Sequence, residues 1–255
     1  MKTTTDAKNH TMFYIYGKQP VFEALLSSHP VDKVILALES DRQYVLKTTE
    51  LARKRNIEVD FMAKSKLQIL TGAVLHQGAL AQLPYYQYLS DQDALQLIRD
   101  CDKPLILILD QIQDPHNLGA IIRTAEVAGV TAIIIPAKST AQINATVVKT
   151  SSGAVFHVPI CRTYHLTSFL ENLFALKVTL AAMVPGVTTS IYDADLTVSM
   201  ALVIGSEGQG VRKNILKYCA LKLAIPGMGR VVALNASVST AIVLFEAVRQ
   251  RRIPA

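Results

Sequence analysis

The second part of the chain repeats one pattern, a short apolar run followed by a stretch with helical periodicity. The runs are Leu105–Leu109, Ala132–Ile135, Val178–Ala182, Ala201–Ile204 and Leu221–Ile225. Helical stretches such as Leu118–Ala128 and Thr167–Leu176 lie between them. Strands that are apolar at every position are buried on both faces, so the pattern predicts an α/β fold with a mostly parallel sheet covered by helices. Ligands of such sheets bind beyond the carboxyl ends of the strands, where we expect the functional residues.

The first part of the chain, residues 12–83, predicts a smaller α/β domain. Its expected strands are Val34–Leu38, Ile57–Met62 and Gly78–Leu83, and its expected helices are Lys18–Leu26 and Asp41–Asn56. The buried face of the second helix is predicted from the spacing of Val45, Leu46, Thr49 and Ala52.

Residues 84–103 separate the two parts and are polar and aromatic. Ser90 with Asp93 three residues later forms a capping-box pattern, which predicts the start of a short helix. We therefore expect a linker with one helix over 84–103 and a second domain over 104–255.

The chain carries a net charge of +6, which favours a polyanionic partner such as RNA. Basic residues gather in the first domain at Arg53, Lys54, Arg55, Lys64 and Lys66. This cluster is either a solvated face or a surface for phosphate contacts, which position RNA without reading its sequence.

Several classes of protein are excluded by what the sequence lacks. No apolar run approaches the roughly 18 residues that span a bilayer, and the polar start has no apolar signal core. Cys101, Cys161 and Cys219 are far apart, with no Cys/His cluster among them. We therefore expect a cytoplasmic protein without a membrane segment, a disulfide framework or a metal site.

The first strand-end segment runs from Asp110 to Arg123. The side chain of Asn117 can cap the next helix by accepting a backbone N–H. The apolar stripe of that helix is Leu118, Ile121, Ile122 and Ala125, and Gly129 is expected to end it. Arg123 lies off the stripe, so it is either a surface charge or free to face a partner.

The second strand-end segment is Gly205–Gly210, whose glycines allow the backbone to approach a ligand closely. It lacks the Gly-Lys-Ser/Thr ending of a P-loop, and Gly227-Met228-Gly229 lacks the third glycine of a dinucleotide fingerprint. These mismatches argue against an NTPase or a dehydrogenase. Glu207 in this loop suits ribose hydroxyls or a guanidinium better than phosphate.

The third strand-end segment runs from Ile225 to Ser237 and opens the last helix, which Asn235 can cap. In this order the three segments resemble the motifs of the SpoU-type (TrmH-like) branch of the SPOUT RNA methyltransferases. The matching residues are Asn117, Gly119 and Arg123 in the first motif, Gly205–Gly208 in the second, and Ile225, Pro226, Gly229, Leu234, Asn235 and Ser237 in the third. The likeness covers about residues 104–250.

The first domain is similar to a ribosomal-protein-like RNA-binding domain that one subgroup of this family carries. The matching residues are Tyr16-Gly17, Val21–Leu25 and His76-Gln77-Gly78. The subgroup most similar to this chain methylates a guanosine of 23S ribosomal RNA at the ribose 2′-hydroxyl.

The resemblance implies a trefoil knot at the carboxyl-terminal end of the second domain, a homodimer, and S-adenosylmethionine as cofactor. It implies cofactor binding at Gly205, Ile225, Leu234, Met228 and Gly229. The implied catalytic residues are Arg123, Asn117, Glu207 and Asn235, with Arg123 reaching the partner chain's cofactor. The family's proposed base is this arginine, although a guanidinium stays protonated in proteins, so orienting phosphate or ribose is the alternative role.

Two departures from the family pattern leave other functions open. Ala233 stands where the family usually has serine, and Gly227 stands where it usually has methionine. The alternatives are the same reaction on transfer RNA, and a non-catalytic RNA-binding factor of ribosome assembly that keeps a degenerate pocket. The first domain favours ribosomal RNA, because minimal transfer-RNA enzymes of this type lack it.

Overall fold

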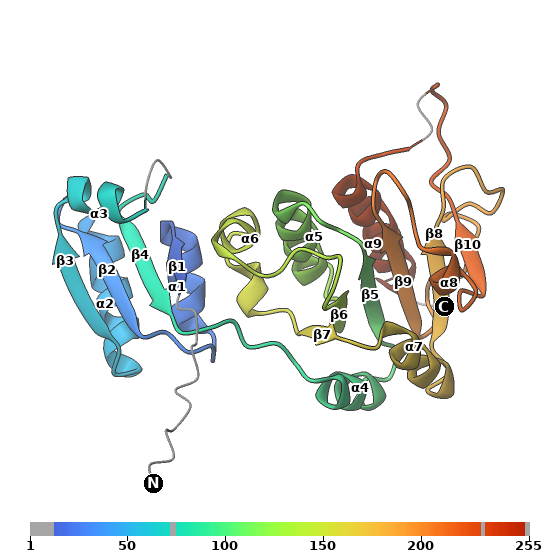
Figure 1. The fold of residues 1–255 in the computed structure, drawn as a ribbon, viewed down its shortest axis with the longest axis horizontal. Helices are drawn as coiled ribbons and strands as arrows, with labels where there is room; N and C mark the ends of the chain where they lie inside the picture. Colours follow the sequence, from blue (N-terminus) through green and yellow to red (C-terminus); the bar gives the residue numbers. More distant parts are fainter. Residues whose placement is uncertain (1–12, 72–74, 231–232, 253–255) are drawn as a thin grey trace, which may run out of the picture. The chain divides into compact units, whose positions relative to one another are not determined.

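The computed structural model describes residues 13–71, 75–230 and 233–252, so the predicted domain ends at residues 12 and 253–255 lie outside it (Figure 1). The chain forms two compact units that divide between Gln87 and Tyr88. Helix α4 (Asp91–Asp100) belongs to the second unit, within the stretch predicted as a linker. The Ser90 hydroxyl accepts the Asp93 N–H at 3.1 Å, as the capping-box pattern predicts.

The first unit is a four-stranded mixed sheet with helices. The strand order is β1-β4-β2-β3, in which only the β2–β3 pair is parallel. Its strands are β1 (Phe13–Tyr16), β2 (Lys33–Ala37), β3 (Glu58–Met62) and β4 (Ala79–Leu83). Its helices are α1 (Lys18–Leu26), α2 (Arg42–Lys54) and α3 (Lys64–Thr71). The sequence pattern predicted the elements from α1 to β3 and also β4, but it missed β1 and α3.

The predicted buried face of α2 is wrong in part. Leu46 is 61% exposed, whereas Thr48 and Ala52, four residues apart, are buried. Leu46 and Thr48 are two residues apart and therefore lie on different sides of the helix.

Arg55, one of the clustered basic residues, has a structural role. Its guanidinium donates hydrogen bonds to the carbonyl oxygens of Ala24, Leu25 and His29, at 2.8, 3.2 and 2.5 Å. These carbonyls lie at and beyond the carboxyl end of α1, where backbone acceptors lack helical partners. The guanidinium of Arg55 therefore binds backbone carbonyls of its own unit.

The residues that carry the resemblance in the first unit build the start of α1. The Gln77 side chain accepts the backbone N–H of Lys18 at 3.2 Å, which satisfies a free amide at the helix start. The ring Nδ1 of buried His76 accepts the N–H of Gly78 at 3.1 Å. Burial, and then the charge of Lys64, lower the pKa of His76, which favours the neutral ring that this bond requires.

The second unit is a six-stranded sheet whose strands are all parallel, in the order β10-β8-β9-β5-β6-β7. The strands are β5 (Leu105–Asp110), β6 (Ala132–Pro136), β7 (Ile160–Thr163), β8 (Thr179–Met183), β9 (Met200–Gly205) and β10 (Leu221–Leu223). Besides α4, the helices are α5 (Pro115–Val127), α6 (Ala145–Thr150), α7 (Leu166–Ala175), α8 (Lys213–Leu216) and α9 (Ala236–Arg252), with a 3-10 turn at Ala154–Phe156. The predicted parallel α/β sheet is confirmed, and β7, α6 and α8 were not foreseen.

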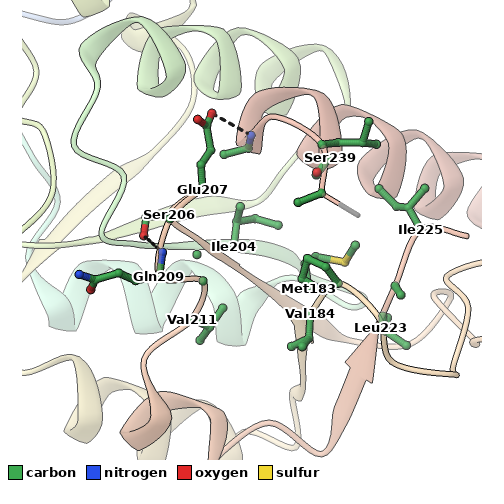
Figure 2. A pocket seen from close by; sticks show the side chains of 18 of the residues that line it. Met183, Val184, Ile204, Ser206, Glu207, Gln209, Val211, Leu223, Ile225 and Ser239 are labelled. Atoms are coloured by element: carbon green, nitrogen blue, oxygen red, sulfur yellow. Dashed lines mark hydrogen bonds between the residues drawn. The ribbon is translucent and has the colours of Figure 1, made fainter. Parts of the chain in front are cut away.

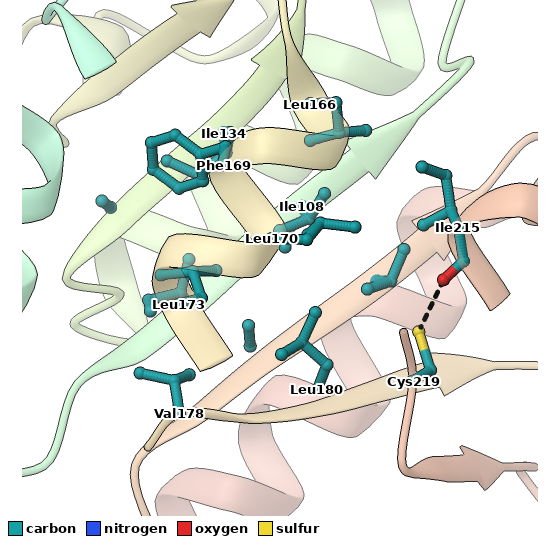
Figure 3. Packing of buried hydrophobic residues seen from close by; sticks show 14 of the residues in the cluster. Ile108, Ile134, Leu166, Phe169, Leu170, Leu173, Val178, Leu180, Ile215 and Cys219 are labelled. Carbon is teal, nitrogen blue, oxygen red and sulfur yellow. Dashed lines mark hydrogen bonds between the residues drawn. The ribbon is translucent and has the colours of Figure 1, made fainter. Parts of the chain in front are cut away.

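Helices cover both faces of this sheet, as Figure 1 shows: α5 and α9 lie on one face, and α4 and α7 on the other. Phe169, Leu170 and Leu173 of α7 are buried in one cluster with Ile108 of β5 and Ile134 of β6 (Figure 3). Burying side chains of this size contributes roughly 1.5–3 kcal/mol each. None of the helices in the described part of the chain has both the length and the apolar character needed to cross a bilayer.

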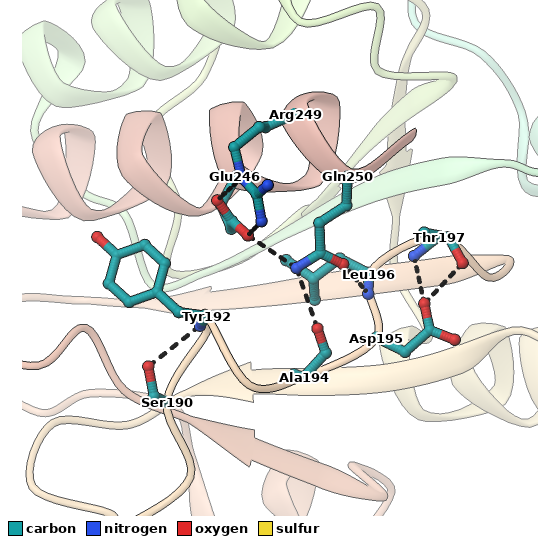
Figure 4. Close-up of polar contacts among 9 residues, drawn as sticks. All are labelled: Ser190, Tyr192, Ala194, Asp195, Leu196, Thr197, Glu246, Arg249 and Gln250. Atoms are coloured by element: carbon teal, nitrogen blue, oxygen red, sulfur yellow. Dashed lines mark hydrogen bonds and ion pairs between the residues drawn. The ribbon is translucent and has the colours of Figure 1, made fainter. Parts of the chain in front are cut away.

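The carboxyl-terminal half of α9 is fastened to the loop before β9. The Gln250 side chain accepts the N–H of Leu196 at 2.9 Å and donates to the Ala194 carbonyl at 3.1 Å (Figure 4). Hydrogen bonds from Arg249 and Gln250 lower the pKa of the buried Glu246 carboxyl to about 2. This end of α9 is therefore held by polar contacts as well as by packing.

Arg251 adds further contacts of the same kind. Its guanidinium donates to the carbonyl oxygens of Leu196, Val198, Lys103 and Pro104, at 3.0, 2.6, 2.8 and 3.4 Å. Arg251 thereby joins α9 to the starts of β5 and β9, the two strands in the middle of the sheet.

We expect Arg251→Gln to lower the free energy of unfolding by about 2–4 kcal/mol, because carbonyl acceptors lose a charged donor. The measurement is the urea midpoint of the full chain. The matched control is Arg252→Gln, which removes the neighbouring, exposed arginine and should change stability by less than about 0.5 kcal/mol. Equal midpoints for the two variants would contradict the anchoring role.

Candidate functional site

The first site segment starts α5, and its cap is not the predicted residue. Asp114 is the N-cap, and its carboxylate accepts the N–H groups of His116 and Asn117 at 3.0 and 3.3 Å. Pro115 explains the difference, because proline favours the first helical position and the cap must precede it. Asn117 therefore lies inside the first turn, and its side-chain amide is free for tertiary contacts. The predicted stripe of Leu118, Ile121, Ile122 and Ala125 is buried.

Asn117, Glu207 and Asn235 meet although they are distant along the chain. The Asn117 amide donates to the Glu207 carboxylate at 3.1 Å, and the Asn235 amide donates to the Asn117 side-chain oxygen at 3.0 Å. The Asn235 amide also donates to the same Glu207 oxygen. The three side chains thus form a closed triangle of hydrogen bonds that joins the strand-end segments.

Asn235 links this triangle to the start of α9. Its side-chain oxygen accepts the N–H of Ser237 at 2.9 Å, which is the capping role that the sequence allowed. The N–H of Ala236 reaches Glu207 at 3.3 Å. Glu207 therefore accepts donors from two amide side chains and from a helix amino terminus, where a negative charge is favourable.

The glycine loop around Glu207 folds back on itself directly after β9. Ser206 and Gly210 form an antiparallel bridge, and Gly210 has a φ of +65°. A Cβ on Gly205 would lie 2.1 Å from the Gly210 carbonyl carbon, so the crossing leaves no room for any side chain there. Gly208, in contrast, would meet nothing within 4 Å.

A buried ion pair fastens the far end of this loop, and sequence reasoning missed it. Asp110, at the end of β5, is fully buried, accepts two hydrogen bonds from Arg212 and forms an ion pair with its guanidinium. The hydrogen-bond donors are the backbone N–H at 2.9 Å and Nε at 2.8 Å, and Nη2 lies 2.6 Å from the carboxylate in the ion pair. The only sequence signal was a carboxylate that follows an apolar run, and nothing local points to its partner.

Gly119 serves packing in this structure. A Cβ there would lie 2.7 Å from the Thr150 Cβ and 2.9 Å from the Val147 carbonyl oxygen. The motif glycine therefore allows α6 to pack closely on α5, the helix that carries Asn117.

A cavity of about 390 Å³ lies beside the triangle, within the roughly 300–1,000 Å³ usual for small-molecule sites (Figure 2). Its walls follow the carboxyl ends of β8, β9 and β10, as expected for a parallel sheet. Apolar side chains form much of the lining, among them Met183, Val184, Ile204, Val211, Leu223 and Ile225. Ser206, Glu207 and Gln209 add polar groups along the loop.

The predicted cofactor residues divide into two groups. Gly205, Ile225 and Leu234 line the cavity, as does Ala233, the departure from the family pattern. Met228 and Gly229 are not among the described lining residues, and Met228 is fully exposed.

Arg123 lies apart from the triangle. It is exposed on α5, and in the described part of the chain no hydrogen bond or ion pair engages it. Arg123 follows Asn117 by six positions in the helix, which is a displacement of about 9 Å along the helix axis and about 120° around it. Asn117, Glu207 and Asn235 are brought together, whereas Arg123 faces elsewhere. Within the described ranges no cluster of His, Cys, Asp and Glu is placed to hold a metal ion.

Comparisons with known proteins agree on one family for both units. The family model described as "SpoU rRNA Methylase family" matches residues 104–245. A second model, described as "RNA 2'-O ribose methyltransferase substrate binding", matches residues 14–89. Among curated proteins, a Bacillus subtilis (strain 168) protein named "Putative TrmH family tRNA/rRNA methyltransferase YacO" is 33% identical over 93% of this chain and 96% of its own length.

Solved structures show the same fold. The SpoU methyltransferase AviRb from Streptomyces viridochromogenes, in complex with the cofactor AdoMet, aligns with a TM-score of 0.79 at 24% identity, over 96% of this chain and 94% of its own. The A. aeolicus TrmH/SpoU tRNA modifying enzyme aligns with a TM-score of 0.53 at 28% identity. That alignment covers 63% of this chain and 82% of the other.

We expect Gly205→Ala to destabilise the second unit, because the added Cβ would meet backbone that cannot move aside cheaply. Overpacking of this kind costs about 1–3 kcal/mol, and backbone conflicts can cost more. The measurement is the thermal midpoint of the full chain. Gly208→Ala is the matched control in the same loop and should leave that midpoint within a few degrees of the parent. A Gly205→Ala protein as stable as this control would show that the loop crossing is not tight.

Proposed function

The chain belongs to the SpoU rRNA methylase family, and we propose that it transfers the methyl group of S-adenosylmethionine to a guanosine ribose 2′-hydroxyl of 23S ribosomal RNA. The observation that carries this proposal is the triangle of Asn117, Glu207 and Asn235 at the edge of the cavity. It unites the three strand-end segments that the sequence alone singled out. The reaction on ribosomal RNA would take place in the cytoplasm.

The cavity fits S-adenosylmethionine in size and chemistry. Its apolar side chains suit the adenine ring and the methylene groups of the methionine arm, and the bare backbone at Gly205 allows close approach. We assign Gly205, Ile225 and Leu234 to hold the cofactor, and Met228 and Gly229 to the exposed loop near it. Bound there, the cofactor supplies a methyl group activated by a positively charged sulfur.

The polar residues of the site then act on the RNA. Glu207 holds the amides of Asn117 and Asn235 in fixed orientations, and these three residues position the ribose. Such positioning lowers the barrier by holding reacting atoms in line. As the 2′-oxygen bonds to the methyl carbon, the bond between that carbon and the sulfur would break, and the hydroxyl proton would pass to solvent water, which reaches the site because Glu207 and Asn235 are exposed. We assign Arg123 to orient the phosphate or ribose of the target nucleotide, because a guanidinium is a fork of donors and remains protonated.

We further propose that the active form is a homodimer in which Arg123 serves the partner's site. Its place on α5, away from the triangle of its own chain, supports this arrangement. The adjacent helices α5 and α9 also expose apolar side chains, with Val127 65%, Val238 46% and Phe245 47% exposed. A second copy would cover such side chains.

The hydrogen bonds around β10 support the trefoil knot that the family resemblance implies. Leu223 and Ala224 bond to Val184 on one side and to Thr189 and Ile191 on the other. The chain thus passes between two parts of the segment that joins β8 to β9 before it turns into α9.

Ribosomal RNA is favoured over transfer RNA because the chain has a substrate-binding unit that matches a family model of its own. The relative named as a transfer-RNA enzyme aligns with only 63% of this chain. Transfer RNA remains the second candidate, since the B. subtilis relative is named for both RNAs.

Isothermal titration calorimetry with S-adenosylmethionine should show micromolar binding to the full chain. Labelled methyl should pass to unmodified 23S ribosomal RNA faster than to unmodified transfer RNA, and mapping should place it on a guanosine ribose. Faster labelling of transfer RNA would select the second candidate. If the chain binds the cofactor but transfers methyl to neither RNA, the result would favour the alternative of a non-catalytic RNA-binding factor, which Ala233 leaves open.

A mixed-dimer experiment tests the role of Arg123. We expect Arg123→Ala and Glu207→Gln each to lower turnover about 100-fold or more, because each removes a charge that positions the reacting groups. Dimers that contain one chain of each variant should regain up to half of the parent activity, since one of their sites has both residues intact. No recovery in purified mixed dimers would place Arg123 in its own chain's site, and unchanged turnover in Arg123→Ala would remove it from the mechanism.

A further inference from the structure

A second cavity, of about 300 Å³, lies beyond the carboxyl ends of β6 and β7. Its lining includes Lys138, Tyr164, His165, Thr167, Ser168 and Arg212. No acidic residue is found among the described residues that line it. The cavity is therefore polar and basic, unlike the apolar cofactor cavity.

The two cavities share a wall. Val211 and Leu216 line the cofactor cavity, whereas Arg212 and Ile215, from the same short segment, line the second cavity. A ligand in the second cavity would thus lie across one segment of chain from the methyl donor.

The cationic groups of the second cavity are partly preorganised. Asp110 holds Nε and Nη2 of Arg212, which fixes the guanidinium plane. Lys138 is exposed, and the described part of the chain offers it no ion pair, so its charge is uncompensated. Thr167 and Ser168 add hydroxyls on the first turn of α7, which has no side-chain cap and whose free amides favour an anion.

Tyr164 gives the cavity an aromatic rim. Its side chain is 71% exposed, and the Arg162 guanidinium carbon lies 5.9 Å from its ring centroid. The same guanidinium lies 5.7 Å from the Tyr88 ring and donates to the Ala137 carbonyl at 3.2 Å. Arg162 is thus held in place behind an exposed aromatic ring, an arrangement suited to stacking with a nucleobase.

We propose that this second cavity binds a backbone phosphate of the RNA strand near the target nucleotide, and that Tyr164 stacks on a neighbouring base. The inference rests on the proposed function and adds a substrate subsite to it. The exposed aromatic ring favours RNA over an acidic peptide, because a peptide carboxylate would use the cations and leave the ring without a partner. Phosphate contact at Lys138 would fix the position of the strand without reading its sequence.

The test is fluorescence anisotropy of a short, labelled single-stranded RNA with the full chain, over a series of KCl concentrations. Lys138→Gln should weaken binding several-fold at low salt and reduce the slope of log affinity against log salt by about 0.7, the value for one phosphate on a single strand. Tyr164→Ala should weaken binding roughly fivefold or more, and Tyr164→Phe should restore it, because the phenyl ring still stacks. Lys177→Gln, an exposed lysine at the other end of α7, is the matched control and should keep the parent slope.

The outcomes separate this subsite from the proposed function. Suppose that the parent chain binds the cofactor and methylates RNA. If Lys138→Gln and Tyr164→Ala then keep the affinity and the salt slope of the parent, the subsite alone is overturned. A parent chain that binds no RNA would overturn both. If poly-glutamate competes with the RNA more strongly than a nucleic acid of equal charge, the occupant is an acidic peptide and the assignment is wrong.

Discussion

The site depends on one carboxylate, that of Glu207, because it joins its own loop to the starts of α5 and α9. Donors from α5, from the residue before α9 and from the first turn of α9 all reach it. A carboxylate at a helix amino terminus is favoured by the helix dipole, and each amide that it binds is fixed in orientation. Replacing this acceptor would remove the shared partner of these N–H groups, and because Glu207 and Asn235 are exposed, water would replace part of the lost hydrogen bonding.

This convergence requires a backbone that is held at both ends of the glycine loop. At one end Gly205 crosses Gly210 so closely that no side chain fits, and at the other end the buried Asp110 carboxylate holds Arg212. A buried carboxylate is costly unless it is paired and hydrogen-bonded, and Asp110 meets both conditions. The loop is therefore shaped by the sheet beneath it, and the cofactor cavity on one side and the basic cavity on the other share the resulting wall.

The fold was predictable where the sequence pattern is nearly continuous. Mostly apolar runs predicted the parallel strands from β5 to β10, although Thr179 and Lys222 interrupt two of them. The exception is β7, whose Ile-Cys-Arg-Thr sequence lies at the sheet edge and carries little pattern. Local rules also placed the Ser90 and Asn235 caps.

Local rules failed where a neighbour or a distant residue decides the outcome. Asn117 resembles a cap until Pro115 sets the first helical position, which makes Asp114 the cap. The partners of Glu207 lie 90 and 28 residues away, so periodicity could not pair them, although the position after a strand marked each one separately. Arg55 and Arg212 look like surface charges in the sequence, and only the structure shows the carbonyls and the carboxylate that engage them.

Two arginines of the second unit differ in the acceptors that their own chain offers them. Arg212 is fixed by a buried carboxylate and serves the architecture, whereas Arg123 is exposed with no acceptor within the described ranges of its own chain. Asn117 and Arg123 lie on different sides of α5, about 120° apart around the helix axis. In the homodimer that we propose, the partner chain supplies the cation for a methyl acceptor held by the triangle. The apolar side chains exposed on α5 and α9 provide the surface on which a second copy would bring one.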